Sequence, residues 1–240
     1  MNVDLLALDG IVVAELAAAC CTSPDMPDME SVSEGPLLSA IESGHQSVLE
    51  HITVSFAISG VSRVTETQLV RHRLASYSIR SGRYCEPSAA IVTPLEQMEP
   101  ADDDPTLPGL TRAYFEGLKA LDDAMKEAGM SKEDRRYMQP QGMTTNIVMT
   151  CNLRELSRIL GLRLCKRAQD EIRDMAEKMG FGVATALFDL MDDGAISEEL
   201  YNALLDLLEP QCQQLGYCPE KRTCGAMPTL DDLRGREGSP

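Results

Sequence analysis

The chain has 240 residues, of which 43% are apolar and 25% charged, an ordinary balance for a globular protein with a sizeable core. No apolar run approaches the length of about 18 residues that a membrane span needs, and the first residues lack the basic segment of a signal peptide. The net charge of −16 argues against general nucleic-acid binding. We therefore expect a cytoplasmic protein that binds neither membranes nor nucleic acids.

The first third of the chain predicts short elements of both kinds. Residues 1–8 are expected to form a strand and residues 12–20 a helix, followed by a polar loop over 22–34 and a short helix over 37–42. Apolar residues then alternate with polar ones over 51–58, which is the period of a half-buried strand. From Val61 the apolar spacing changes to three or four, which predicts a helix leading towards Arg71.

The rest of the chain is predicted to be mainly helical. An acidic, proline-containing loop is expected over 99–108, an amphipathic helix over 111–128, a β-like run over 146–151, and one long helix or two abutting helices over 152–179. Further helices follow over 181–191 and 197–208. The predicted fold class is α+β, a mixed or antiparallel sheet flanked by long helices with a helical C-terminal part. We expect one domain over residues 1–229 and a flexible tail over 230–240.

Positive charge is concentrated in two segments of this acidic chain. Residues 62–84 contain five Arg and one Glu, and residues 131–173 contain seven Arg and two Lys against five acids. The preference for Arg favours bidentate recognition of phosphate or carboxylate. The sequence therefore indicates a site for a small, multiply charged anion, although a solvated basic helix end would give the first segment the same composition.

Two arginines lie where the helical pattern predicts an apolar face. If residues 152–173 form one helix, Arg163 and Arg167 are one turn apart within the stripe of Leu156, Leu160 and Leu164. Burying two like charges without a partner costs several kcal/mol or more. A negative ligand or internal salt bridges, for example to Glu171, must then face them.

The spacing of the first segment adds a more specific signal. Arg71-His72-Arg73, seven further residues and then Ser81 resemble the signature of flavin-dependent thymidylate synthases. The resemblance extends over about residues 40–175. It includes the blocks Gly44-His45-Gln46-Ser47, Gly60-Val61-Ser62-Arg63, Gln68-Leu69-Val70, Arg136 four residues before Pro140, Asn152-Leu153-Arg154-Glu155, Leu162-Arg163, Arg167-Ala168-Gln169 and Glu171-Ile172-Arg173.

This resemblance implies an enzyme that converts dUMP to dTMP. In this family methylenetetrahydrofolate donates the carbon, FAD supplies the hydride and NADPH reduces the flavin again. The family uses no cysteine nucleophile and typically forms a homotetramer with active sites shared between subunits. We therefore expect dUMP, folate and NADPH as partners, FAD as cofactor, and no metal.

The resemblance also assigns roles to individual residues. FAD binding is implied for His45, Ser47, Arg71, His72, Arg73, Asn152, Arg154, Arg158 and Arg167. Binding of dUMP is implied for Gln68, Arg71, Arg80, Ser81, Gly82, Arg83, Arg136 and Arg163, with Arg136 coming from a neighbouring subunit. Arg163 is the implied catalytic residue, because a fixed guanidinium at the uracil favours loss of the N3 proton and makes C5 a better nucleophile.

Three positions depart from the family pattern. Ile79 stands where many members have Glu, Arg158 where others have Asn or His, and Arg167 where His is frequent. The missing carboxylate at Ile79 leaves open a flavin- and nucleotide-binding paralogue that does not methylate.

The C-terminal cysteines leave a second alternative open. Cys212, Cys218 and Cys224 are six residues apart, and three soft ligands could bind Zn²⁺ or an iron–sulfur cluster. Close Cys-x-x-Cys spacing is absent, which favours free or packed thiols. A non-enzymatic helical protein with a metal site at this end is the corresponding alternative.

Overall fold

The structure is a computed structural model that describes residues 1–87, 90–92 and 107–237. It divides into two compact units. The first contains residues 1–2, 58–70 and 78–147, and the second contains residues 3–57, 71–77 and 148–240. The single domain expected over 1–229 stays a prediction. None of the helices in the described ranges is both long enough and apolar enough to cross a membrane.

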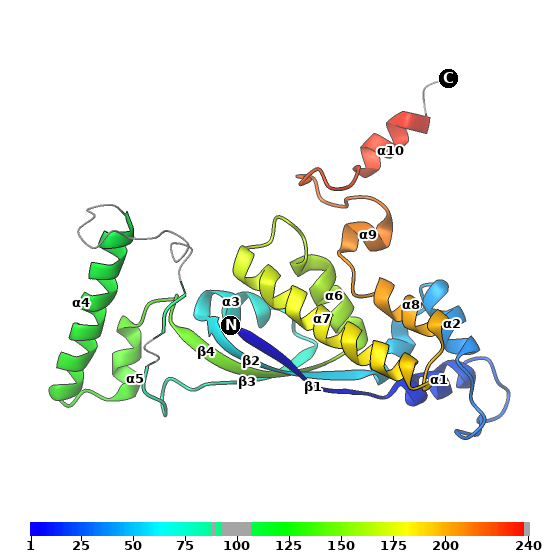
Figure 1. The fold of residues 1–240 in the computed structure, drawn as a ribbon, viewed down its shortest axis with the longest axis horizontal. Coiled ribbons are helices and arrows are strands. Elements are labelled where there is room, and N and C mark those ends of the chain that lie inside the picture. The colour runs from blue at the N-terminus through cyan, green and yellow to red at the C-terminus, as the bar shows by residue number, and fades with distance from the viewer. Residues whose placement is uncertain (88–89, 93–106, 238–240) are drawn as a thin grey trace. The chain divides into compact units, whose positions relative to one another are not determined.

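Four strands form one antiparallel sheet in the order β1-β2-β4-β3 (Figure 1). Their bounds are β1 Asn2–Asp9, β2 Thr53–Ser62, β3 Ala75–Ile79 and β4 Thr144–Asn152. Val54 and Phe56 of β2 and Ile147 and Met149 of β4 are buried, so both strands alternate as expected of strands with one covered face. A sheet combined with many helices confirms the predicted α+β class.

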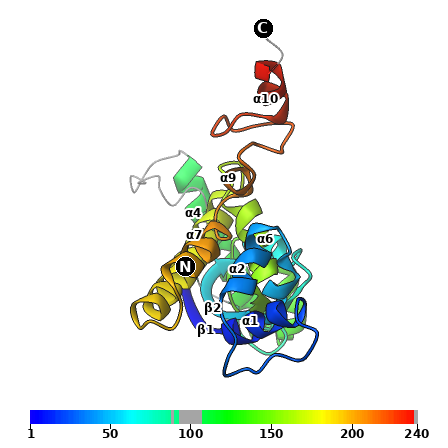
Figure 2. The ribbon, with the colours of Figure 1, turned by 90° about the vertical axis from the view of Figure 1, so that its right-hand side faces the viewer.

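The second unit holds most of the helices. They are α1 (Ile11–Cys20), α2 (Gly35–Glu42), the 3₁₀ helix η1 (Gln46–His51), α6 (Leu153–Arg163), α7 (Asp170–Asp192), α8 (Glu198–Asp206), α9 (Gln211–Leu215) and α10 (Leu230–Glu237). Helix α6 packs against η1, α7 and α9, and α1 packs against η1. Helix α1 also packs against α2 (Figure 2). Leu156, Ile159 and Leu160 of α6 are fully buried. Helix α6 is therefore central to this unit.

The first unit contains α3 (Arg63–Leu69), α4 (Leu107–Glu127), α5 (Lys132–Arg135) and the 3₁₀ helix η2 (Arg136–Met138). The helix predicted over 111–128 is confirmed, and it begins earlier, at Leu107. Of the loop predicted over 99–108, residues 99–106 lie outside the described residues. Ser62 caps α3, because its hydroxyl accepts a hydrogen bond from the Thr65 amide at 3.1 Å.

One glycine sets the position of η1 in the second unit. Gly10 has a φ of +96°, and a Cβ added there would lie 2.2 Å from the carbonyl oxygen of His51. Only glycine combines this backbone conformation with so close an approach. The start of α1 is thereby packed directly against the end of η1.

The prediction that Arg163 and Arg167 share one helix face is wrong. Helix α6 ends at Arg163 and α7 begins at Asp170, so Arg167 lies in the connecting segment. The Arg173 guanidinium stabilises this break by donating to the carbonyl oxygens of Lys166 at 3.3 Å and Ala168 at 3.4 Å. Helix α10 occupies residues 230–237, and the flexible tail expected over 230–240 stays a prediction.

Candidate functional site

The imidazole of His72 is buried beside α6 in the second unit. Only 6% of the residue is exposed, and its Nε2 accepts a hydrogen bond from Nε of Arg163 at 3.1 Å. Its Nδ1 lies 3.8 Å from the Glu155 carboxylate. The Tyr77 hydroxyl donates to the His72 carbonyl oxygen at 2.9 Å, which fixes the backbone at this point. His72 thus connects the first Arg-rich segment to the last turn of α6.

The electrostatics of this pair keep the imidazole neutral. Burial first, and then the positive charges of Arg163 and Arg158, lower the pKa of His72 from 6.5 to about 4. Burial also lowers the pKa of the Arg163 guanidinium, although a group of this kind stays protonated at neutral pH. A neutral Nε2 can accept a hydrogen bond from this cation. The resulting arrangement is a half-buried guanidinium held in one orientation.

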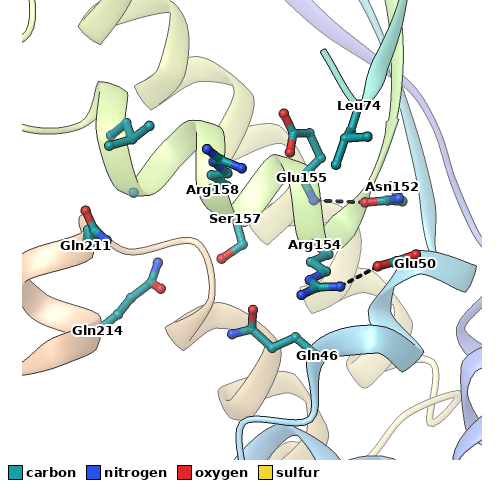
Figure 3. Close-up of a pocket in the computed structure, with 12 residues that line it drawn as sticks. Gln46, Glu50, Leu74, Asn152, Arg154, Glu155, Ser157, Arg158, Gln211 and Gln214 are labelled. Atoms are coloured by element: carbon teal, nitrogen blue, oxygen red, sulfur yellow. Dashed lines mark hydrogen bonds and ion pairs between the residues drawn. The ribbon is translucent and has the colours of Figure 1, made fainter. Parts of the chain in front are cut away.

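A large cavity opens along α6 (Figure 3). Its volume is ≈ 670 Å³, within the range of small-molecule and cofactor sites. Figure 3 shows Arg154 and Arg158 on α6, Gln46 on η1, and Gln211 and Gln214 on α9 across from them. Side chains from Glu50, Leu74, Asn152, Glu155, Ser157, Gly161 and Leu162 complete the lining. We call this space the α6 cavity.

The N-terminus of α6 opens into this cavity. The Asn152 side chain caps the helix by accepting a hydrogen bond from the Glu155 amide at 2.8 Å. The N-terminal dipole of an 11-residue helix favours an anion nearby. Arg154 is half exposed and paired with Glu50 at 2.5 Å. An exposed pair of this kind is worth little, so it can open when an anionic ligand arrives.

The other residues predicted for FAD are on the surface of the second unit. His45 and Ser47 are exposed at the start of η1. Arg71 and Arg73 are exposed in the turn that precedes β3. Within the part of the chain that the structure describes, neither of these two guanidinium groups has an acidic partner. They are therefore available to an anionic ligand.

Most residues predicted for dUMP lie in the first unit. Arg80, Ser81, Gly82 and Arg136 line one small cavity, with a volume of ≈ 20 Å³, together with Arg63, Cys85, Glu86, Pro87, Gln139, Met143 and Thr144. The Ser81 hydroxyl accepts a hydrogen bond from the Arg83 amide at 3.2 Å. Arg80 donates to the Glu86 carbonyl oxygen at 2.5 Å. Guanidinium groups and a hydroxyl from an exposed turn thus lie around this small cavity.

The other first-unit residues predicted for dUMP are Arg83 and Gln68. Arg83 and Arg136 both approach Glu133, at 3.2 Å and 3.9 Å. Gln68 is half-buried on α3. Ile79 is the last residue of β3, directly before Arg80, so the expected carboxylate is missing at the entrance to the segment.

Arg135 has a structural role that the sequence did not predict. Its side chain is only 2% exposed and binds Glu86 at 2.5 Å and Asp122 at 3.2 Å. Asp122 also accepts a hydrogen bond from the Gln139 amide group at 3.1 Å. Arg135 therefore joins α4 and α5 to the segment after Ser81, and it is not part of the anion site.

A second cavity in the second unit is lined by four cysteines, namely Cys165, Cys212, Cys218 and Cys224. Burial raises the pKa of the Cys212 thiol. The neighbouring Cys218, Cys165 and Cys224 raise it further, because their thiolates would be negatively charged. Cys151 of β4 is different, because burial raises its pKa to about 12. Cys151 therefore stays protonated at neutral pH and is a poor nucleophile.

Several lining residues were not predicted from the sequence. Gln46 lies inside the block Gly44-His45-Gln46-Ser47, so its neighbours were a usable signal. Gln211 and Gln214 are isolated polar residues on a five-residue helix, and nothing in the sequence marks them. Cys165 was not grouped with the C-terminal cysteines, since it is far from them in sequence.

Comparison with known proteins agrees with these motifs. The family model described as "Thymidylate synthase complementing protein" matches residues 8–186. The flavin-dependent thymidylate synthase of Thermococcus kodakarensis is 42% identical over 185 residues, which cover 74% of this chain and 69% of that protein. The enzyme of the same name from Sulfolobus acidocaldarius is 44% identical over 147 residues, covering 58% of this chain and 53% of that protein.

Solved structures share the fold. A UMP/dUMP methylase from Streptomyces cacaoi, bound with 5-Br dUMP, superposes with a TM-score of 0.63 at 25% identity, covering 77% of this chain and 90% of that chain. Thymidylate synthase X from Helicobacter pylori, with FAD and dUMP, gives a TM-score of 0.61 at 22% identity, covering 87% and 99%.

Proposed function

Because the chain belongs to the flavin-dependent thymidylate synthase family, we propose that it converts dUMP to dTMP with methylenetetrahydrofolate as carbon donor. FAD is the proposed cofactor and NADPH the proposed reductant. The observation that carries this proposal is the fixed guanidinium of Arg163, held by a buried neutral His72 at the end of α6.

The α6 cavity fits a dinucleotide cofactor. Its size is suitable, and it offers cationic groups at Arg154 and Arg158, a helix N-terminus and the amide of Gln211. These donors match the phosphate oxygens and nucleobase edges of FAD. The Gln214 amide nitrogen already donates to the carbonyl oxygens of Leu207 and Glu209. We therefore assign the adenylate and pyrophosphate of FAD to this cavity. When bound and reduced, the flavin supplies the hydride.

Further residues are proposed for the flavin from their exposure and position. Arg71 and Arg73 are exposed cations without an acidic partner among the described residues, and His45 and Ser47 are exposed beside Gln46 of the cavity wall. Arg167 is a weaker candidate than the family pattern implies. Its guanidinium donates to the carbonyl oxygen of Arg222 in the C-terminal segment, so another bond already engages it.

The dUMP phosphate is assigned to the segment after β3. Ser81 and Arg83 supply a hydroxyl and a guanidinium, and Arg80 and Arg136 add positive charge. Gly82 keeps the approach open, since even a Cβ there would meet only the Arg136 side chain at 3.6 Å. Gln68 and Arg71 are proposed to complete the nucleotide contacts.

Arg163 is the proposed catalytic residue. Its guanidinium stabilises negative charge on the uracil ring as the N3 proton is lost, and this charge raises the nucleophilicity of C5. His72 keeps the group in one orientation, so little reorganisation is needed when the charge develops. No cysteine is required, which agrees with the protonated state of Cys151.

The proposals for the assembly and the cellular compartment rest on the family pattern. We propose a cytoplasmic homotetramer with active sites shared between subunits, in which Arg136 reaches the dUMP of a neighbouring subunit. Size-exclusion chromatography with light scattering tests this. A fully active monomer would contradict it.

The central test is tritium release from 5-³H-dUMP by protein loaded with FAD. We expect release that requires both methylenetetrahydrofolate and NADPH. An Arg163→Ala variant should retain flavin absorption and lose turnover, whereas Arg112→Ala, an exposed arginine of α4, should behave as wild type. NADPH oxidation without tritium release would instead support the non-methylating paralogue, whose motivating feature is Ile79.

A further inference from the structure

The four-cysteine cavity is built from separate segments of the second unit. Its volume is ≈ 300 Å³. Cys165 follows α6, Cys212 is on α9, and Cys218 and Cys224 lie between α9 and α10. All four are free thiols, and they make up half of the chain's eight cysteines. Three of them lie beyond residue 186, where the match to the family model ends.

These segments are tied together by bonds independent of the cysteines' sulfur atoms. The Cys218 amide donates to the Pro228 carbonyl oxygen at 2.7 Å, and Cys218 and Thr229 form a parallel bridge. Arg167, two residues after Cys165, donates to the carbonyl oxygen of Arg222. Helix α9 packs against α6. The cavity is therefore defined by the backbone of the fold.

The dimensions of the cavity bear on what it can hold. A single Zn²⁺ needs its thiolates at about 2.3 Å from one point. In the described ranges no three His, Cys, Asp or Glu side chains are arranged to hold a metal ion. The four cysteines instead line a cavity of ≈ 300 Å³, which is much larger than a single metal ion. In a [4Fe–4S] cluster each thiolate binds a different iron at a corner of the cubane. The four thiolates therefore lie farther apart than the ligands of a single metal ion.

We propose that the four-cysteine cavity binds a [4Fe–4S] cluster. Four cysteine thiolates are the ligand set of such clusters.

The rest of the lining suits an anionic cluster. A cubane with four thiolates carries net negative charge, and the cationic residues Arg163 and Arg167 line the same space together with one acid, Glu220. Leu162, Met227 and Pro210 add apolar side chains to the lining. The proposed methylation does not require this cluster, so the two proposals can be tested separately.

The test is anaerobic reconstitution of the full-length protein with ferrous iron and sulfide. We expect about four iron and about four acid-labile sulfide per chain after desalting. We also expect an electron paramagnetic resonance signal from the dithionite-reduced protein that differs from that of a flavin radical. One zinc per chain without iron would overturn the proposal. Disulfides among these cysteines, detected by mass spectrometry, would overturn it as well.

Variants locate the cluster. Cys218→Ala and Cys165→Ala remove ligands from different segments, and each should retain less than about one tenth of the wild-type iron. Cys20→Ala and Cys21→Ala change exposed cysteines of the same unit and should retain all of it. Circular dichroism checks folding, and Cys165→Ala is the variant least expected to perturb it, because Cys165 is half-buried in a loop. Full iron content in folded Cys165→Ala would refute the four-cysteine assignment.

Discussion

Replacing His72 by Phe tests how Arg163 is held. Phenylalanine fills a similar space but removes Nε2, the acceptor at 3.1 Å from the Arg163 Nε. Arg163 is half-buried, and the His72 site is almost fully closed to solvent, so water replaces this bond poorly. We expect a more mobile guanidinium at the uracil.

The size of the effect follows from the kind of bond. A hydrogen bond to a charged group is worth about 1.5–3 kcal/mol. If that energy is lost from the transition state, kcat falls about 10- to 150-fold. The loss should appear in kcat with little change in flavin content, because His72 holds Arg163 and is not itself a lining residue of the α6 cavity.

The assay is steady-state tritium release with flavin occupancy measured from the visible spectrum. His72→Gln offers a carbonyl oxygen near the position of Nε2, so it should recover much of the lost rate. His51→Gln changes an exposed histidine of η1 and serves as the matched control. If His72→Phe loses flavin while kcat per bound flavin stays normal, the ring acts on the cofactor and our reasoning is wrong. Equal losses in the Phe and Gln variants would indicate a general structural role.

Three further predictions concern stability and are measured by denaturant unfolding. Since the pKa of His72 is lowered from 6.5 to about 4, the unfolded chain takes up a proton in this window that the native chain does not. The free energy of unfolding should therefore fall as the pH drops from 6.5 to 4, by up to about 3 kcal/mol, and this component should be missing in His72→Gln. Gly10→Ala should cost well over 1 kcal/mol, because its Cβ would meet the His51 carbonyl oxygen. Gly194→Ala, also at positive φ but with nothing within 4 Å, should cost only about 1 kcal/mol, and equal costs would contradict the argument. Arg135→Met should cost about 3 kcal/mol by leaving Asp122 without its ion pair, whereas Arg136→Met, which breaks an exposed pair at 3.9 Å, should cost under about 1 kcal/mol.

Local patterns predicted several elements of this fold, although they missed β3 and divided α7 at residue 180. The alternation over 51–58 and the amphipathic spacing over 111–128 identified β2 and α4, because side-chain burial follows the period of each element. The break between α6 and α7 was not predicted, since the apolar period continues through it. The bonds from Arg173 to the carbonyl oxygens of Lys166 and Ala168 stabilise the break, and such bonds form only once the chain has turned.

The candidate site was predicted through its motifs more than through its charges. The order of the motifs indicated Arg71, His72 and Arg163, but it did not show that the His72 ring faces Arg163. Contacts of this kind join residues distant in sequence, as do the four cysteines around one cavity and the glutamines of α9. A single sequence contains no local signal for them.

The structure separates the arginines of the two basic segments by the partners they have. Some are already neutralised, as Arg63 is by Glu66 and Arg135 by Glu86. The excess of arginine in these segments therefore overestimates how many guanidinium groups are available to bind an anion. Arg71 and Arg73 are different, because they are exposed and have no acidic partner in the described part of the chain. Arg163 is different again, because it is half-buried and its Nε donates to the uncharged imidazole of His72, which orients the guanidinium. A cation in that state can act on a ligand, which is why Arg163, rather than the more numerous surface arginines, is the residue on which the proposed chemistry depends.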